Sequence, residues 1–170
     1  MAKIALVTGA NRGIGFEVAR QLGKAGMTVI LGSRDREKGA EAHSVLDKEG
    51  LRVRSQLLDL LNPGTARMAA DFIGVKYGRL DVLVNNAGGF YDQEATPSKT
   101  SLKYLREALE NNLIGTWSVI QAMLPLLLKS SSARIVNVSS GMGSYGDPQT
   151  GLGTLGGAAP AYALSKLALN

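Results

Sequence analysis

Short apolar runs alternate with longer segments of helical periodicity along the whole chain. The run over residues 4–7 is continuous, which is typical of a strand buried on both faces of a parallel sheet, and further strands are predicted over residues 28–31, 53–58, 80–84 and 134–138. Between them, the spacing of apolar positions predicts helices over residues 14–25, 35–49, 63–76, 102–128 and from 161 onwards. This alternation predicts an α/β domain with a doubly wound parallel sheet and helices on both of its faces.

Three residues refine the predicted helices. Asn62 followed by Pro63 is typical of an N-cap with proline at the first helical position. Pro125 is expected to kink or shorten the end of the long helix, because proline has no N–H for the helical hydrogen bond. Asn112 stands in the middle of the same helix, where asparagine is unfavourable unless its side chain has a partner.

The composition limits the classes of function. The chain has 170 residues, enough for one domain, and its 45% hydrophobic and 19% charged residues are typical of a globular protein. It has no Cys and one His, His43, which excludes a disulfide scaffold, a thiol nucleophile and Cys- or His-rich metal sites. The net charge of +5 is spread along the chain, so it favours an anionic small ligand no more than nucleic acid.

The sequence gives no sign of a membrane or secretory protein. No apolar run reaches the roughly 18 residues that a membrane span needs, and Met1 leads almost directly into the first strand. We therefore expect a soluble, cytoplasmic domain that acts on a small molecule, without a metal, nucleic acid or membrane partner, while a homo-oligomer remains open. The loops at 88–100 and 141–160 follow strands, which predicts a ligand site at the carboxyl edge of the sheet.

The turn after the first strand carries three glycines, in the run Thr8-Gly9-Ala10-Asn11-Arg12-Gly13-Ile14-Gly15. Gly9 allows the tight turn, Gly13 lets the backbone approach a phosphate, and Gly15 lets the helix pack closely on the sheet. The start of the helix adds free N–H groups and the positive end of its dipole. A purely structural turn also uses glycine, but the strand–turn–helix context favours nucleotide binding.

Three further motifs lie at the ends of later elements. The run Asn85-Asn86-Ala87-Gly88 is either a polar turn or, because its residues are small, room for an adenosine moiety. Tyr162 and Lys166 share a helix face, and an ammonium beside a phenol suits a general acid or base, although this spacing also arises by chance. Ser139 and Ser140 end the fifth strand, where serines are commonly only turn formers.

Together these motifs resemble the short-chain dehydrogenase/reductase family, in its compact, carbonyl-reductase-like branch. The matching residues follow the family's order over essentially the whole chain: Thr8-Gly-x-x-x-Gly-x-Gly15, Asp59, Asn85-Asn-Ala-Gly88, Asn112, Ser140 and Tyr162-x-x-x-Lys166. The resemblance implies a Rossmann-like sheet with strand order 3-2-1-4-5 and a single NAD(P)-binding domain over residues 1–170.

The resemblance also implies four catalytic residues. Tyr162 would donate a proton to a ketone oxygen, or accept one from an alcohol. Lys166 would bind the nicotinamide ribose and lower the pKa of Tyr162. Ser140, rather than Ser139, would hydrogen-bond the substrate oxygen, because the family's catalytic serine is usually the second of the pair. Asn112 would hold a water that links Lys166 to solvent.

The end of the second strand bears on the choice of cofactor. NAD-preferring folds place an acidic residue there, but here Ser33 occupies the position and Arg34 follows it. Arg12 adds a second guanidinium, and two of them suit a 2′-phosphate, unless a register shift of two makes Asp35 the ribose ligand. The sequence therefore predicts an NADP-dependent oxidoreductase that reduces a ketone or aldehyde to an alcohol, or catalyses the reverse.

The expected cofactor contacts combine these motifs. The resemblance implies that Asp59, with Leu60 beside it, contacts the adenine ring. The complete set is Gly9, Asn11, Arg12, Gly13, Ile14, Gly15, Ser33, Arg34, Asp59, Leu60, Asn86, Ala87, Gly88, Tyr162 and Lys166.

Two departures from the family pattern leave alternatives open. The loop between Ser140 and Tyr162 is longer than in the simplest relatives, as in carbonyl reductases and plant ketone reductases, and would shape the substrate pocket. The sequence ends at Asn170, without the usual sixth and seventh strands and the lid. We therefore expect the 170 residues alone to be nearly inactive and prone to associate or unfold. A non-catalytic nucleotide-binding module and a Rossmann-type transferase remain alternatives.

Overall fold

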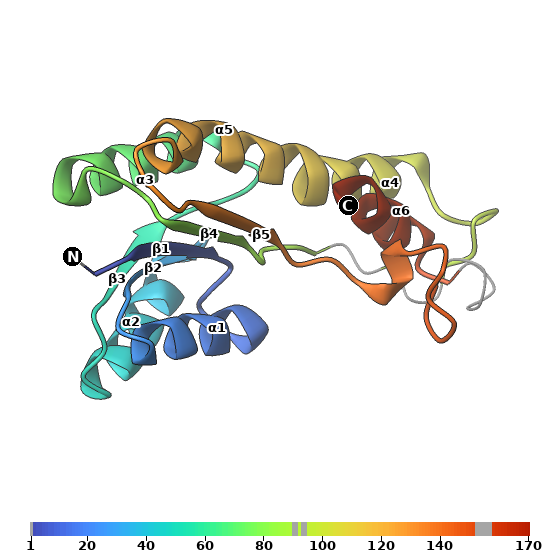
Figure 1. Ribbon diagram of the computed structural model, residues 1–170. Helices are drawn as coiled ribbons and strands as arrows, with labels where there is room; N and C mark the ends of the chain where they lie inside the picture. The colour runs from blue at the N-terminus through green and yellow to red at the C-terminus, as the bar shows by residue number, and fades with distance from the viewer. Residues whose placement is uncertain (1, 90–91, 93–94, 152–157) are drawn as a thin grey trace.

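Five parallel strands form one sheet in the computed structural model, which describes residues 2–89, 92, 95–151 and 158–170. The strand order is β3-β2-β1-β4-β5, which confirms the predicted doubly wound topology (Figure 1). The strands are β1 (Ile4–Thr8), β2 (Thr28–Ser33), β3 (Val53–Leu57), β4 (Val82–Asn85) and β5 (Arg134–Asn137). The central strand, β1, is buried along its whole length.

Helices cover both faces of the sheet. On one face lie α1 (Gly13–Lys24) and α2 (Arg36–Lys48), and on the other α3 (Pro63–Tyr77) and α5 (Thr116–Leu127) (Figure 1). Beyond the carboxyl end of the sheet, α4 (Leu102–Leu109) packs against α6 (Pro160–Leu169). Asn62 caps α3 as predicted, because its Oδ1 accepts the Gly64 N–H. Within the described ranges, no helix combines the length and the apolar character needed to cross a membrane.

The prediction of one continuous helix over residues 102–128 is wrong in its middle. After α4 the chain forms a π-helical segment, η1 (Glu110–Gly115), before α5 begins. This wider turn contains Asn111 and Asn112, and both residues are buried. Such π-helical turns are frequent at functional sites.

The apolar periodicity of this region does not mark a single buried stripe. Val119 lies in the core, whereas Trp117 is 62% exposed. α5 ends at Leu127, two residues after Pro125, so the proline stands in the last turn of the helix.

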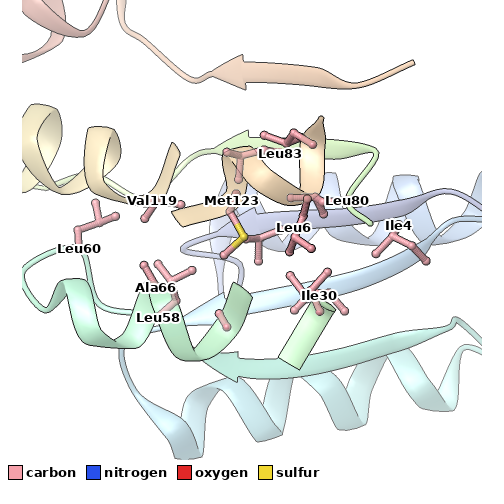
Figure 2. Close-up of a cluster of buried hydrophobic side chains, with 14 residues drawn as sticks. Ile4, Leu6, Ile30, Leu58, Leu60, Ala66, Leu80, Leu83, Val119 and Met123 are labelled. Carbon is pink, nitrogen blue, oxygen red and sulfur yellow. The ribbon is translucent and has the colours of Figure 1, made fainter. Parts of the chain in front are cut away.

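Two hydrophobic clusters cover the two faces of the sheet. The larger includes Leu6, Ile30 and Leu83 from the strands, and residues of α3 and α5 pack over them (Figure 2). The smaller contains Val7 and Leu31 together with residues of α1 and α2. Neighbouring residues of β1 and of β2 thus enter opposite clusters, which explains why these two central strands are apolar at successive positions.

A buried carboxylate joins the amino ends of the central strands. Asp81 precedes β4 and accepts the Ile4 N–H (2.8 Å), the Ser130 hydroxyl (2.6 Å) and the Arg79 Nε–H (3.1 Å). Burial alone would raise the pKa of Asp81, but these hydrogen bonds and the Arg79 charge outweigh burial and hold that pKa below its usual value. The carboxylate therefore ties β1 and β4 to the loop that leads into β5.

Replacing Asp81 by alanine should destabilise the fold, because it leaves the buried Ile4 N–H and the Ser130 hydroxyl without their acceptor. We expect Asp81→Ala to lower the free energy of unfolding by about 2–3 kcal/mol in urea denaturation. Asp71→Ala, which removes an exposed carboxylate from α3, should change it by less than about 0.5 kcal/mol.

The contribution of Asp81 to the free energy of unfolding should also depend on pH. Because the pKa of Asp81 is lowered in the folded state, its contribution is present above about pH 4 and is lost as the pH falls through the folded-state pKa. The difference between wild type and Asp81→Ala should therefore shrink on acidification. A difference independent of pH would show that the charge of Asp81 does not stabilise the fold.

Candidate active site

The turn between β1 and α1 packs tightly against the residues that follow β4. Gly9 has a φ of 64°, and a Cβ there would lie 2.9 Å from the Ala87 Cα. A Cβ on Gly15 would overlap the Asn86 side-chain amide. That amide donates to the carbonyl oxygens of Thr8 (3.0 Å) and Gly9 (3.3 Å). The outer two glycines of the predicted motif are thus required by the close approach of two chain segments.

The middle glycine of the motif faces open space. Gly13 has a φ of 59°, and no described atom lies within 4 Å of where its Cβ would be. Arg12 stands at the N-cap of α1, and its side chain makes no capping hydrogen bond. Arg12, Gly13 and Ile14 are exposed, with Asn11 partly so. Backbone N–H groups at a helix start and an exposed guanidinium are the donors that a phosphate needs, so a dinucleotide pyrophosphate fits this turn.

The end of β2 presents a neutral residue. Ser33 is the last residue of the strand, its hydroxyl donates to the Asp35 carbonyl (2.7 Å), and the exposed Arg34 follows. The Asp35 carboxylate caps α2 by accepting the Lys38 N–H (3.1 Å), and this bond, together with the Lys38 ammonium, holds the pKa of Asp35 below its usual value. Asp35 therefore has a structural partner, and β2 ends at Ser33, as predicted from the sequence.

The two residues expected at the adenine ring lie in different surroundings. Asp59 is partly exposed after β3, and its carboxylate accepts the Leu61 N–H (3.1 Å). The Leu60 side chain belongs to the larger core cluster (Figure 2). A Cβ on Gly115 would lie 2.6 Å from the Leu60 carbonyl oxygen, so η1 packs directly on this backbone. Leu60 is therefore a core residue, whereas Asp59 presents a carboxylate at the sheet edge.

Helix α6 brings Tyr162 and Lys166 to the carboxyl end of the sheet. Lys166 is only 3% exposed, and its Nζ donates to the Val138 carbonyl directly after β5 (2.8 Å). Nζ lies 5.9 Å from the centroid of the Tyr162 ring, in agreement with the helix face predicted from their spacing. A Cβ on Gly88 would lie 3.2 Å from the same Nζ. Burial lowers the pKa of Lys166.

Asn112 has the side-chain partners that its position required. Its Oδ1 accepts the Gly89 N–H (2.9 Å) and the Asn111 side-chain amide (2.8 Å). Its Nδ2 donates to the Gly89 carbonyl (2.9 Å) and to the Ser165 hydroxyl (2.8 Å). The side chain therefore joins the loop after β4 to α6, and its own hydrogen-bonding groups are already engaged. A water linked to Lys166, as the resemblance implied, would have to bind elsewhere on this residue.

Ser140 lies at the start of a short 3₁₀ helix, η2 (Gly141–Gly143), which packs on α6. The Ser140 Oγ accepts the Met142 N–H (3.2 Å). Gly143 touches α6, because a Cβ there would lie 2.7 Å from the Lys166 carbonyl carbon. The Ser139 hydroxyl is buried and has no hydrogen-bond partner among the described residues. Ser140 therefore stands at the start of a short helix that packs on α6, the helix that carries Tyr162 and Lys166.

A family model for short chain dehydrogenases matches residues 3–170. The chain belongs to the short-chain dehydrogenase family. It is 40% identical over 162 residues to "Short-chain dehydrogenase/reductase 1" of Saponaria officinalis, covering 83% of this chain and 54% of the relative. It is 43% identical over 139 residues to "Carbonyl reductase [NADPH] 1" of Mus musculus, covering 81% and 48% respectively.

Solved structures of short-chain dehydrogenases share the fold. A Shigella flexneri short chain dehydrogenase complexed with NADP superposes with a TM-score of 0.83 at 36% identity, over 98% of this chain and 66% of that one. The chain spans about half the length of the curated relatives it matches. The match over residues 3–170 agrees with the resemblance inferred from the motifs.

Two residues of this site, Ser165 and Asp92, were not predicted from the sequence. Ser165 lies inside the Tyr162–Lys166 run, but a small serine gives no periodic signal, and its bond to Asn112 joins residues 53 positions apart. Asp92 lies in the loop after β4 and accepts the Ala161 N–H, 69 positions along the chain. A loop aspartate carries no local sign of such a distant partner.

The contact of η2 with α6 can be tested at two glycines of one loop. Gly143→Ala should push η2 off the Lys166 backbone and lower the free energy of unfolding by about 1–3 kcal/mol, measured by denaturant titration. Gly146→Ala is the matched control, because a Cβ there meets no described atom within 4 Å, and it should change stability by less than about 0.5 kcal/mol. Equal effects at both positions would contradict the close contact.

Proposed function

We propose that this chain is the nucleotide-binding and catalytic part of an NADP-dependent oxidoreductase that reduces a ketone or aldehyde to an alcohol, or catalyses the reverse. The observation that carries the proposal is the buried Lys166 ammonium. It lies one turn from Tyr162 and against Gly88, at the sheet edge where the glycine turn of β1 also ends. A phenol and an ammonium on the same edge as the exposed helix start of the glycine turn suit proton transfer beside a bound dinucleotide.

In this mechanism the chain supplies proton transfer and orientation, and a bound nicotinamide supplies the hydride. Tyr162 donates its phenolic proton to the carbonyl oxygen as negative charge develops there. The Lys166 ammonium nearby stabilises the phenolate that remains, because an opposite charge favours the ionised form. In the oxidative direction the same phenolate removes the proton of the alcohol.

Ser140 and Lys166 each keep donors for this chemistry. The Ser140 oxygen accepts the Met142 N–H, and its own hydroxyl proton can be donated to the substrate oxygen. Lys166 gives one of its three N–H donors to Val138, which leaves the others for ribose hydroxyls. Two hydrogen-bond donors on one carbonyl oxygen stabilise the charge that develops during hydride transfer.

The preference for NADP is supported by the end of β2. Ser33 is neutral, Arg34 is exposed beside it, and Asp35 is engaged as the cap of α2. Arg12 is exposed in the glycine turn. Guanidinium groups bind phosphate bidentately, so a 2′-phosphate would be favoured over a hydroxyl. The mouse relative is named as an NADPH enzyme, and the Shigella flexneri structure contains NADP.

Tyr162→Phe tests the proton donor. The variant keeps the ring and loses the proton, so in the full-length enzyme we expect the reduction rate with NADPH and a panel of small ketones and aldehydes to fall at least about a hundredfold. Cofactor affinity, measured by fluorescence titration, should stay the same. Tyr77→Phe, the same change at the end of α3, is the control and should keep the wild-type rate. More than about a tenth of the rate in Tyr162→Phe would rule out its role as the acid.

Cofactor titrations at one salt concentration test the proposed preference for NADP. We expect NADPH to bind at least about tenfold more tightly than NADH, which is about 1.4 kcal/mol. Ser33→Asp combined with Arg34→Gln should reverse the preference, because a carboxylate bonds the ribose hydroxyl and repels the 2′-phosphate. Arg67→Gln, which removes an exposed cation from α3, should leave it unchanged. Equal affinities of the wild type for both cofactors would overturn the assignment.

A further inference from the structure

Helix α6 begins without a cap from its own sequence. Its N-cap residue is Ala159, which has no side-chain acceptor and a left-handed backbone with φ 49°. Pro160 follows and has no N–H. The first N–H groups that need an acceptor are therefore those of Ala161 and Tyr162.

Asp92, from the loop after β4, supplies both acceptors. Its Oδ2 accepts the Ala161 N–H at 3.0 Å, and its Oδ1 accepts the Tyr162 N–H at 3.2 Å. The Thr100 hydroxyl donates to the same Oδ2 at 3.2 Å and helps to orient the carboxylate. A carboxylate at a helix start is also favoured by the helix dipole.

The backbone of Tyr162 is thus held on both sides. Its N–H is bound by Asp92, and its carbonyl accepts the Ser165 hydroxyl at 2.7 Å. Ser165 in turn accepts from Asn112, whose amide is bound to Gly89. Both chains of bonds return to the loop after β4, at residues 89 and 92. The segment that holds the proposed proton donor therefore lies far from it in sequence.

We propose that Asp92 is a positioning residue of the active site, which fixes the start of α6 and so the place of the Tyr162 side chain. The proposal rests on the proposed function, because it matters only if Tyr162 transfers the proton. A displacement of about 1 Å at a reacting group can cost about a hundredfold in rate.

The experiment compares Asp92→Ala and Asp92→Asn with Asn62→Ala, which removes the cap of α3 at a site that takes no part in the reaction. Steady-state rates are measured with NADPH and the fastest ketone of the panel, and NADPH affinity by fluorescence titration. Amide hydrogen exchange of the Ala161–Tyr162 segment and thermal unfolding are followed on the same samples. The exchange measurement reports the cap independently of turnover.

We expect Asp92→Ala to lower kcat about ten- to a hundredfold, with KM and NADPH affinity within about twofold, and to speed exchange at Tyr162. Asp92→Asn keeps an acceptor oxygen and should recover most of kcat, since asparagine caps helices as well as aspartate. Asn62→Ala should keep the wild-type kcat despite losing stability. If Asp92→Ala does not fold, Asp92→Ser gives the same comparison.

The results that would contradict the positioning role differ from the result that would contradict the proposed function. Wild-type kcat in Asp92→Ala, or an equal loss in Asn62→Ala, would overturn the positioning role while the proposed function stands. A loss of kcat that Asp92→Asn does not recover, with exchange at Tyr162 unchanged, would also overturn it. A full-length wild-type enzyme that binds NADPH and reduces no carbonyl would overturn the proposed function, and the positioning role with it.

Discussion

The buried ammonium of Lys166 sets the geometry on which the rest of the site depends. A buried charge is costly unless it is hydrogen-bonded, and the acceptor that Lys166 has is the Val138 carbonyl at the end of β5. Helix α6 must therefore lie across the carboxyl end of the sheet. This position brings Gly88 against the ammonium and Gly143 against the backbone of α6, and neither site leaves room for a side chain.

Close backbone contacts of the same kind build the opposite half of the edge. Gly9 and Gly15 allow the turn of β1 to lie against Asn86 and Ala87, while Gly13 keeps open space in front of α1. The closed contacts give the turn one fixed shape, and the open one leaves access to the helix start. A single edge thus carries both the exposed start of α1 and the Tyr162–Lys166 pair.

Much of this arrangement could be predicted from the sequence, for local reasons. The apolar run of the central strand β1 predicted it because this strand is buried on both faces, as Leu6 and Val7 show by entering opposite clusters. The isolated Asn112 predicted a side-chain partner. The prediction of one helix over residues 102–128 failed where the chain packs on a distant segment: η1 is π-helical and lies against the Leu60 backbone.

The sequence by itself determined the order of strands and helices, the glycine turn, and the spacing that places Tyr162 and Lys166 on one helix face. These follow from periodicity and backbone conformation, which act over a few residues. Only the tertiary structure decided that Asp92 caps α6, that Asn112 binds Ser165, and that η2 lies on the Lys166 backbone. Those contacts join segments tens of residues apart. The local sequence around a polar side chain in a loop or on a helix does not indicate which distant residue it will bind.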